Sequence, residues 1–211
     1  MRYKDLSYEW QVCFGMARSA FEHGSLPIGC LIVDKDGKDI AHASAAMVYG
    51  SKKTNMTQHA EIEALAKIPV PDLEQRLTMY STVEPCPMCF GAINVARISE
   101  LHYATRDPWA GSTDLVDGNW YMRRKHIEIK RAGMEFERIM ASWLVYAWSK
   151  KPAEDGLQDM ENEFVERWKL IVPDIVAVAH RILSAKIESY SRDTELFETL
   201  NHAIMEEKTN G

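Results

Sequence analysis

The sequence has little of what marks a secreted, membrane-spanning or disulfide-stabilised protein. It contains no run of about 18 apolar residues, so no membrane span is predicted. Its first residues do not combine an apolar stretch with a cleavage site, so no signal peptide is expected. Four cysteines among 211 residues are too few for a disulfide scaffold. These absences favour a cytoplasmic protein.

Basic residues are also in the minority. The chain has 25 Lys and Arg against 31 Asp and Glu, which gives a formal net charge of -6. Proteins that bind long polyanions usually present a basic surface. The charge therefore makes DNA or tRNA an unlikely main partner without excluding it. The hydrophobic fraction of 46% is enough for one well-buried domain with a small appendage.

Apolar periodicity predicts alternating helices and strands over the first 150 residues. Apolar residues three or four apart predict a helix from Leu6 to about Gly24. Strands over 28–33 and 38–45 flank a turn signal and predict a hairpin. Further helices are predicted over 58–67, 85–96 and 136–149, and further strands over 77–83, 100–105 and around 127–129. Helices that alternate with strands indicate a layered α/β sandwich.

The composition changes after Lys151. Residues 152–156 resemble a short linker, and helices are predicted near 157–171, 173–190 and 194–208. We therefore expect a first domain over 1–151 and a C-terminal helical extension over 152–211. Three roles stay open for the extension: packing on the core, forming a dimer interface, or covering the mouth of the active site.

Two short motifs carry the candidate metal chemistry. The letters HAE at 59–61 begin one predicted helix, and PCPMC at 85–89 begins the next, after one strand. Cys86 and Cys89 are three residues apart and share a helix face, and the helix dipole favours their thiolate forms. With His59 they make a three-ligand set typical of zinc. Three protein ligands leave a fourth position open for water, as in catalytic zinc sites.

Glu61 follows His59 by two residues and is our candidate for the catalytic acid and base. Zinc can lower the pKa of a bound water to about 7. Glu61 could then take a proton from that water and return it to a leaving nitrogen. A thioredoxin-like redox pair and a structural zinc site with a distant fourth ligand remain as alternatives. The HAE motif and the flanking prolines disfavour both.

These motifs, together with LPIG at 26–29, EPCPMC at 84–89 and GAI at 91–93, resemble the cytidine deaminase-like superfamily of zinc deaminases. The resemblance covers about residues 5–150 and is strongest to the branch of guanine, cytosine and tRNA adenosine deaminases. It implies a three-layer α-β-α sandwich with a central five-stranded mixed sheet, a homodimer and a Zn²⁺ cofactor. It also implies that zinc-bound hydroxide attacks an amino-substituted ring and releases ammonia.

The resemblance also suggests how a substrate is held. Backbone groups around Ala60 and Cys86 would face it, and Trp109 would stack on its ring. Gly29 either lets the backbone approach the ring closely or is needed for strand packing. The loop carboxylates would accept hydrogen bonds from the substrate. The predicted substrate contacts are Gly29, Asn55, Ala60, Pro85, Trp109, Asp114 and Asp117.

One departure from the family affects the choice of substrate. Relatives commonly carry an asparagine just after the second strand, where this chain has Ala45, and Asn55 is the candidate replacement. We predict a deaminase of a small amino-substituted heterocycle: a purine or pyrimidine base, a nucleoside or a triazine-like analogue. The alternatives are a tRNA adenosine deaminase acting on an anticodon adenosine, and a non-catalytic zinc-stabilised binding module, which the presence of Glu61 disfavours.

Overall fold

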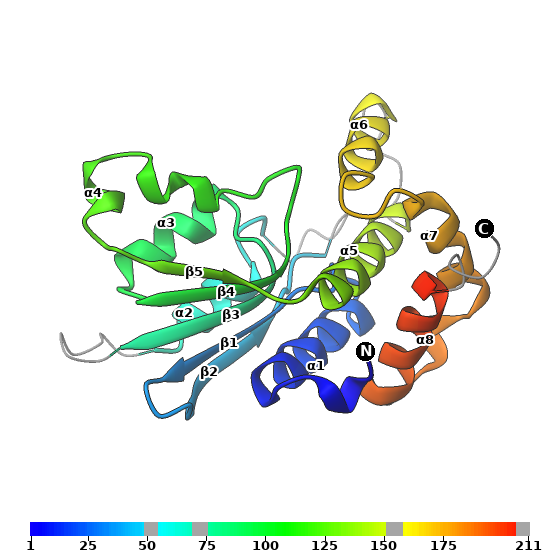
Figure 1. Cartoon of the computed structure of the whole chain (residues 1–211), viewed down its shortest axis with the longest axis horizontal. Coiled ribbons are helices and arrows are strands. Elements are labelled where there is room, and N and C mark those ends of the chain that lie inside the picture. Colours follow the sequence, from blue (N-terminus) through cyan, green and yellow to red (C-terminus); the bar gives the residue numbers. More distant parts are fainter. Residues whose placement is uncertain (49–54, 69–75, 151–157, 206–211) are drawn as a thin grey trace.

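The fold is built on a central β-sheet. The computed structural model describes residues 1–48, 55–68, 76–150 and 158–205. Its strands stand in the order β2-β1-β3-β4-β5, with β1 antiparallel to β2 and β3, and with β4 parallel to β3 and β5. The predicted five-stranded mixed sheet is confirmed (Figure 1). The strands are β1 (Gly29–Asp34), β2 (Asp39–Ser44), β3 (Leu77–Val83), β4 (Glu100–Thr105) and β5 (Glu128–Arg131).

The hairpin that opens the sheet follows from local sequence. The first five residues of β1 are buried, as expected for an apolar strand between two neighbours with both faces covered. Its last residue, Asp34, turns the chain because Oδ1 accepts hydrogen bonds from the backbone N–H groups of Asp36 (2.9 Å) and Lys38 (3.0 Å). Gly37 completes the turn with a φ of +77°, which favours glycine.

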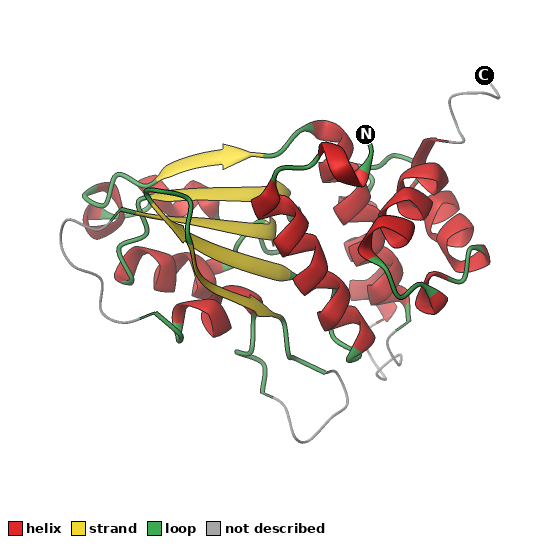
Figure 2. Cartoon of the chain, turned by 90° about the horizontal axis from the view of Figure 1, so that it is seen from below, coloured by secondary structure: helices red, strands yellow, loops and turns green. Residues whose placement is uncertain are grey.

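Helices cover both faces of the sheet and give the predicted three layers (Figure 2). Helices α1 (Tyr8–Glu22) and α5 (Met134–Ser149) lie against one face, and α2 (Ala60–Leu65) and α3 (Pro87–Val95) against the other. Strands β2 and β3 run in the same direction, since both are antiparallel to β1. Because α2 follows β2 and α3 follows β3, both helices begin beyond the C-terminal ends of these two strands, at the same end of the sheet.

The C-terminal helices pack on the α1–α5 face. Helices α6 (Gln158–Trp168), α7 (Ile175–Ser184) and α8 (Asp193–Met205) share a hydrophobic cluster with α1 and α5, in which Trp143, Ile182 and Phe197 are fully buried. No helix in the described part of the chain is long and apolar enough to cross a membrane. The short helix α4 (Trp120–Arg123) and the 3-10 helices over 3–5 and 113–117 were not predicted, because such short elements carry no periodicity. The helix predicted near 173–190 ends earlier, at Ser184, and a separate 3-10 turn over 187–189 follows Lys186, whose φ of +50° interrupts the helix.

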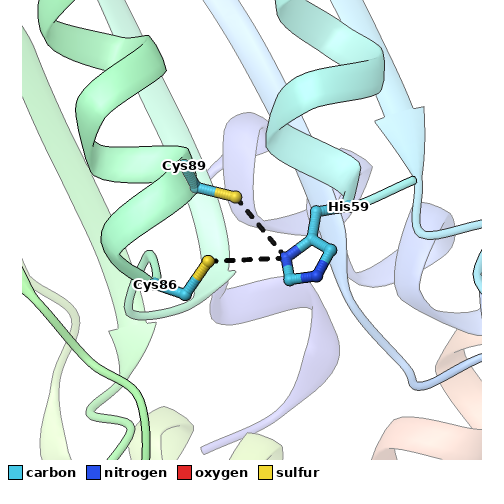
Figure 3. Close-up of side chains that lie close together, drawn as sticks. All are labelled: His59, Cys86 and Cys89. Atoms are coloured by element: carbon cyan, nitrogen blue, oxygen red, sulfur yellow. Dashed lines mark hydrogen bonds between the residues drawn. The ribbon is translucent and has the colours of Figure 1, made fainter. Parts of the chain in front are cut away.

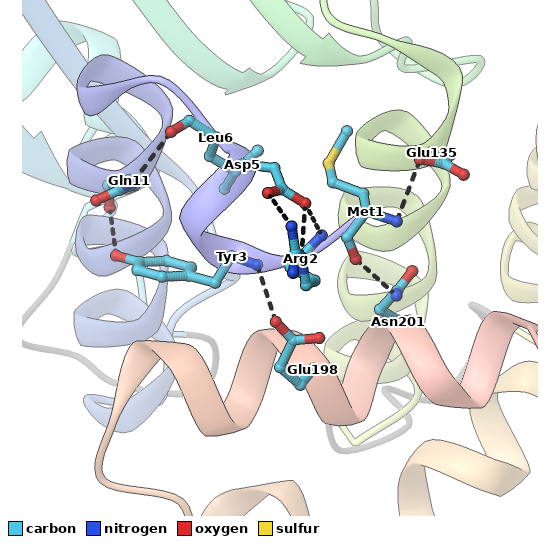
Figure 4. Close-up of polar contacts among 9 residues, drawn as sticks. All are labelled: Met1, Arg2, Tyr3, Asp5, Leu6, Gln11, Glu135, Glu198 and Asn201. Atoms are coloured by element: carbon cyan, nitrogen blue, oxygen red, sulfur yellow. Dashed lines mark hydrogen bonds and ion pairs between the residues drawn. The ribbon is translucent and has the colours of Figure 1, made fainter.

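The first residues hold α8 against the rest of the molecule (Figure 4). The backbone N–H of Tyr3 donates to Glu198 Oε1 at 2.9 Å, and Asn201 donates to the carbonyl of Met1 at 2.9 Å. The Tyr3 ring meets Phe14 of α1 and Phe197 of α8 edge-on, with centroids 5.9 and 5.7 Å apart. The N-terminal turn therefore links α1 to α8.

Candidate active site

The three candidate metal ligands meet where two helices begin. His59 is the N-cap of α2, Cys86 is the N-cap of α3, and Cys89 lies in the first turn of α3. His59 Nδ1 lies 3.7 Å from Cys86 Sγ and 3.5 Å from Cys89 Sγ (Figure 3). The three ligand atoms all lie within 4.8 Å of one another. The topology thus brings together side chains about 30 residues apart.

This geometry fits a zinc ion. Tetrahedral zinc with ordinary bond lengths to sulfur and nitrogen holds those two ligand atoms about 3.6 Å apart. The observed separations of 3.7 and 3.5 Å agree with that value. Two thiols and an imidazole are also a donor set that zinc prefers. Among the described residues, no fourth His, Cys, Asp or Glu joins the group, so these three residues would leave one tetrahedral position of a bound zinc for water.

The thiols are arranged to favour metal binding. The pKa of Cys86 is lowered to about 4, because its sulfur accepts hydrogen bonds from the Cys89 thiol and from His59. The same shared hydrogen bond, together with burial, raises the pKa of Cys89. Cys86 therefore offers a thiolate at neutral pH, and a metal that binds both sulfurs displaces the proton of Cys89.

Glu61 lies beside the ligands in a fixed orientation. Its side chain is 3% exposed, and Oε1 accepts a hydrogen bond from the Ser81 hydroxyl of β3 at 3.0 Å. The other carboxylate oxygen, Oε2, lies 3.5 Å from Cys89 Sγ. Burial raises the pKa of Glu61. A carboxylate whose pKa is raised toward neutrality is suited to accept a proton and then release it.

A cavity of about 190 Å³ opens beside the metal ligands. His59, Glu61 and Cys86 form one side of it. Most of the remaining surface is apolar and comes from elements far apart in the sequence. The apolar and aromatic lining residues are Leu26, Ile28, Ala45, Met47, Met56, Val83, Trp109, Ala110, Leu144, Trp148, Phe164 and Trp168.

Two further carboxylates line the cavity and fold the loop over 107–113. Glu84 accepts hydrogen bonds from the backbone N–H groups of Asp107 and Thr113, both at 3.2 Å, and from the Thr113 hydroxyl. Asp107 Oδ1 accepts from the N–H groups of Trp109 (2.9 Å) and Ala110 (3.1 Å), and burial raises the pKa of Asp107. The sequence analysis missed both roles. The Asp-Pro pair at 107–108 was the available signal, since Asp often caps its own turn.

The predicted contacts near the ligands occupy different places. Trp109 lines the cavity. Ala60 and Pro85 are buried next to His59 and Cys86 but do not line it. Gly29 faces α1: a Cβ built on it would lie 2.2 Å from the Cys13 carbonyl oxygen. Its position therefore fits strand packing, one of its two predicted roles.

The remaining predicted contacts lie outside the cavity. Asp114 and Asp117 are exposed in the 3-10 turn over 113–117 and do not line it. Asn55 is also exposed, and its Oδ1 accepts hydrogen bonds from the N–H (2.8 Å) and the hydroxyl of Thr57. Ala45 does line the cavity, at the place where the family commonly has asparagine. Asn55 does not supply the missing amide there.

Comparison with known proteins agrees with the resemblance to zinc deaminases. Residues 4–105 match the cytidine and deoxycytidylate deaminase zinc-binding region. A tRNA-specific adenosine deaminase from Agrobacterium fabrum is 37% identical over an alignment of 105 residues, which covers 46% of this chain and 64% of that protein. One from Streptococcus pyogenes serotype M18 is 32% identical over 54% of this chain and 70% of its own. The chain covers as little as 19% of another curated relative.

A solved structure supports the same fold. The protein NE0047 in complex with 2,6-diaminopurine superposes with a TM-score of 0.50, over 70% of this chain and 84% of its own. The two sequences are 19% identical over that match, so the likeness concerns the fold alone.

Proposed function

The chain belongs to the cytidine deaminase-like superfamily of zinc-dependent hydrolytic deaminases, and from that premise we propose that it deaminates a small, uncharged, amino-substituted heterocycle. The proposed substrates are a purine or pyrimidine base, a nucleoside or a triazine-like analogue. We propose His59, Cys86 and Cys89 as the zinc ligands and Glu61 as the catalytic acid and base. Water is consumed, the C–N bond breaks, a carbonyl replaces the amino group, and ammonia leaves.

Two residues of the chain, Glu61 and Ser81, have separate roles in the proposed reaction. When bound, zinc acts as a Lewis acid that lowers the pKa of water at the site. Glu61 takes one proton from the attacking water and passes it to the ring nitrogen; it then takes the second proton, from the hydroxyl now on the ring carbon, and passes it to the amino group, which leaves as ammonia. Ser81 holds Glu61 by its hydrogen bond at 3.0 Å, so the carboxylate needs no reorientation between these transfers.

The charge of the residues that line the cavity is the observation that favours an uncharged substrate. Three carboxylates line the cavity, those of Glu61, Glu84 and Asp107, and among the described lining residues none is lysine or arginine. Arg167 does not itself line the cavity: its guanidinium pairs with Glu163 at 2.7 Å and lies 5.7 Å from the centroid of the Trp109 ring. A phosphate in this cavity would lose its hydration without gaining a lysine or arginine partner, and it would lie near the carboxylates of Glu84 and Asp107, which is costly. An uncharged ring avoids that cost.

Deamination of a tRNA adenosine is the second candidate. It is favoured by the two relatives named tRNA-specific adenosine deaminases. The net charge of -6 and the carboxylate-lined cavity oppose it, because an anticodon nucleotide brings its phosphates with it. The homodimer and the cytoplasmic location remain predictions.

Ammonia release by zinc-loaded protein tests the proposal. The panel consists of guanine, cytosine, adenine and melamine, the nucleosides of the three bases, and a tRNA anticodon stem-loop. We expect turnover of at least one uncharged compound, and none with Glu61→Gln at unchanged zinc content. Turnover of the stem-loop alone would refute the proposal and favour deamination of a tRNA adenosine. No turnover of any compound at full zinc occupancy would refute deamination.

A further inference from the structure

The cavity beside the metal ligands opens to solvent at Trp109. Among the lining residues that the structure describes, only Met56 and Trp109 are exposed, to 65% and 36%. The other lining residues are buried or half-buried. We call the opening at Met56 and Trp109 the mouth of the cavity, and any part of a bound molecule that reaches solvent has to pass it.

Helix α6 holds Trp109 at the mouth through two contacts with its indole ring. The ring of Phe164, which also lines the cavity, meets the indole edge-on with centroids 6.0 Å apart. The guanidinium of Arg167 lies over the same indole, 5.7 Å from its centroid, and Arg167 Nη1 donates a hydrogen bond to the carbonyl of Pro108 at 3.4 Å. The C-terminal extension therefore helps to fix the position of Trp109.

Both contacts come from side chains that have partners of their own. Phe164 is 5% exposed and stacks on Trp148 of α5, with centroids 4.5 Å apart and planes 18° apart. Arg167 pairs with Glu163 at 2.7 Å within α6. A group that displaces Trp109 from the mouth therefore breaks an aromatic pair and a cation–π contact.

A nucleoside needs the mouth, whereas a free base does not. In adenosine, cytidine and guanosine the sugar is attached to a ring nitrogen that is not bonded to the amino-bearing carbon. A ring that presents this carbon to His59, Glu61 and Cys86 therefore directs its sugar away from them. The cavity of about 190 Å³ is smaller than the roughly 300–1,000 Å³ of pockets that enclose drug-sized ligands, so the sugar has to extend through the mouth, past Trp109.

We propose that Phe164 and Arg167 are positioning residues that hold Trp109 across the mouth and thereby select a free base over its nucleoside. The proposal rests on the function proposed above and narrows its substrates to compounds without a sugar. The selectivity equals the cost of displacing Trp109, which a sugar requires and a base alone does not. All three residues lie beyond the stretch over 4–105 that matches the family, so the family match does not account for this selectivity.

Calorimetric titration of the zinc-loaded Glu61→Gln protein tests this selectivity. The probes are three pairs: adenine with adenosine, cytosine with cytidine, and guanine with guanosine. With α6 unchanged, the nucleoside of a bound base should bind about 5- to 70-fold more weakly than the base, the value of one aromatic pair and one exposed cation–π contact. Arg167→Ala should reduce this ratio about 2- to 5-fold and leave the Kd of the base unchanged, because Arg167 does not line the cavity. Phe164→Leu, which keeps an apolar side chain, should reduce the ratio about 2- to 12-fold.

Two controls separate the role of Arg167 from a general effect of surface charge. Arg192→Ala removes another exposed arginine that pairs with a glutamate, Glu195, and it should leave the ratio unchanged. In a Trp109→Ala background, Arg167→Ala should also leave the ratio unchanged, since the residue through which it acts is gone.

Any other pattern overturns the proposal. Control of the mouth by α6 is refuted if base and nucleoside bind equally while α6 is unchanged, or if neither Arg167→Ala nor Phe164→Leu reduces the ratio. It is also refuted if Arg192→Ala reduces the ratio as much, or if no compound binds. Ammonia release by the Glu61 form of each variant separates the two proposals. Equal turnover of base and nucleoside rejects selection at the mouth and keeps the deaminase, whereas selective binding without turnover does the reverse.

Discussion

Replacing Gly29 with alanine places a methyl group where α1 already lies. The new Cβ would be 2.2 Å from the Cys13 carbonyl oxygen, 2.6 Å from the Ala17 nitrogen and 2.7 Å from Met16 Cβ. Two of these are backbone atoms of α1, so no side-chain rotation relieves the overlap. Either α1 moves away from β1 or the strand is displaced, and both loosen the packing between α1 and the sheet.

We expect the loss in free energy of unfolding caused by Gly29→Ala to lie at the upper end of the range for overpacked interiors. Insertion of one methyl group into a packed interior costs about 1–3 kcal/mol, and we expect Gly29→Ala to lose about 3 kcal/mol, because the overlap is with backbone. For a chain of this length that loss lowers the melting temperature by about 6–12 °C. Thermal and urea unfolding of the zinc-loaded protein measure it.

The matched control is Gly91→Ala in α3. A Cβ on Gly91 would meet nothing within 4 Å, and alanine in a helix interior is favoured over glycine by about 0.5–1 kcal/mol. We therefore expect the control to unfold at or slightly above the wild-type midpoint. If Gly29→Ala also unfolds at the wild-type midpoint but has a higher KM, Gly29 serves substrate approach, and the packing argument is refuted.

Three other perturbations have defined outcomes. Glu84→Ala leaves the N–H groups of Asp107 and Thr113 unpaired, so stability should fall by about 2–4 kcal/mol in urea and KM should rise as Trp109 loses its position; unchanged values would show that the loop folds without Glu84. Protein in free zinc at about 1,000 times its Kd should melt about 8–16 °C higher than the same protein after a chelator has removed the zinc. Equal melting temperatures would contradict a zinc site at these residues. The hydrogen bond from Lys130, with a second from His102, lowers the pKa of Glu100, so its stabilising contribution is present at neutral pH and is lost as pH falls through that lowered pKa. Glu100→Gln should be slightly less stable than wild type at pH 7 and equally stable in acid, and a difference that persists in acid would refute this.

Local sequence predicted the sheet and most of the helices. Strands β3 and β4 coincide with their predicted ranges, because each is a short apolar segment followed within three residues by a proline, Pro85 after β3 and Pro108 after β4. Helix α3 begins at Pro87 and not at 85, since Cys86 takes the extended N-cap conformation that proline then follows. Helix α4 went unpredicted because its four residues are stabilised by one side chain, Asn119, which accepts from the N–H of Met122.

The metal ligands could be predicted from the sequence, whereas most residues of the cavity wall could not. His59, Cys86 and Cys89 lie within two short motifs, so spacing alone groups them. Phe164 and Trp168 lie more than 70 residues after the last ligand and reach the cavity only because α6 packs against α5. No local pattern separates such residues from ordinary core aromatics. The substrate contacts were therefore the part of the site that sequence described least well.

The link between the N-terminal turn and α8 sets an order of events during synthesis. Tyr3 and Glu198 are 195 residues apart, which is about 10–40 s of translation. The sheet, the metal ligands and α5 have all left the ribosome before the partner of Tyr3 is made. The nascent chain can therefore close its metal site while the ring of Tyr3 still lacks Phe197, and α8 docks only after that.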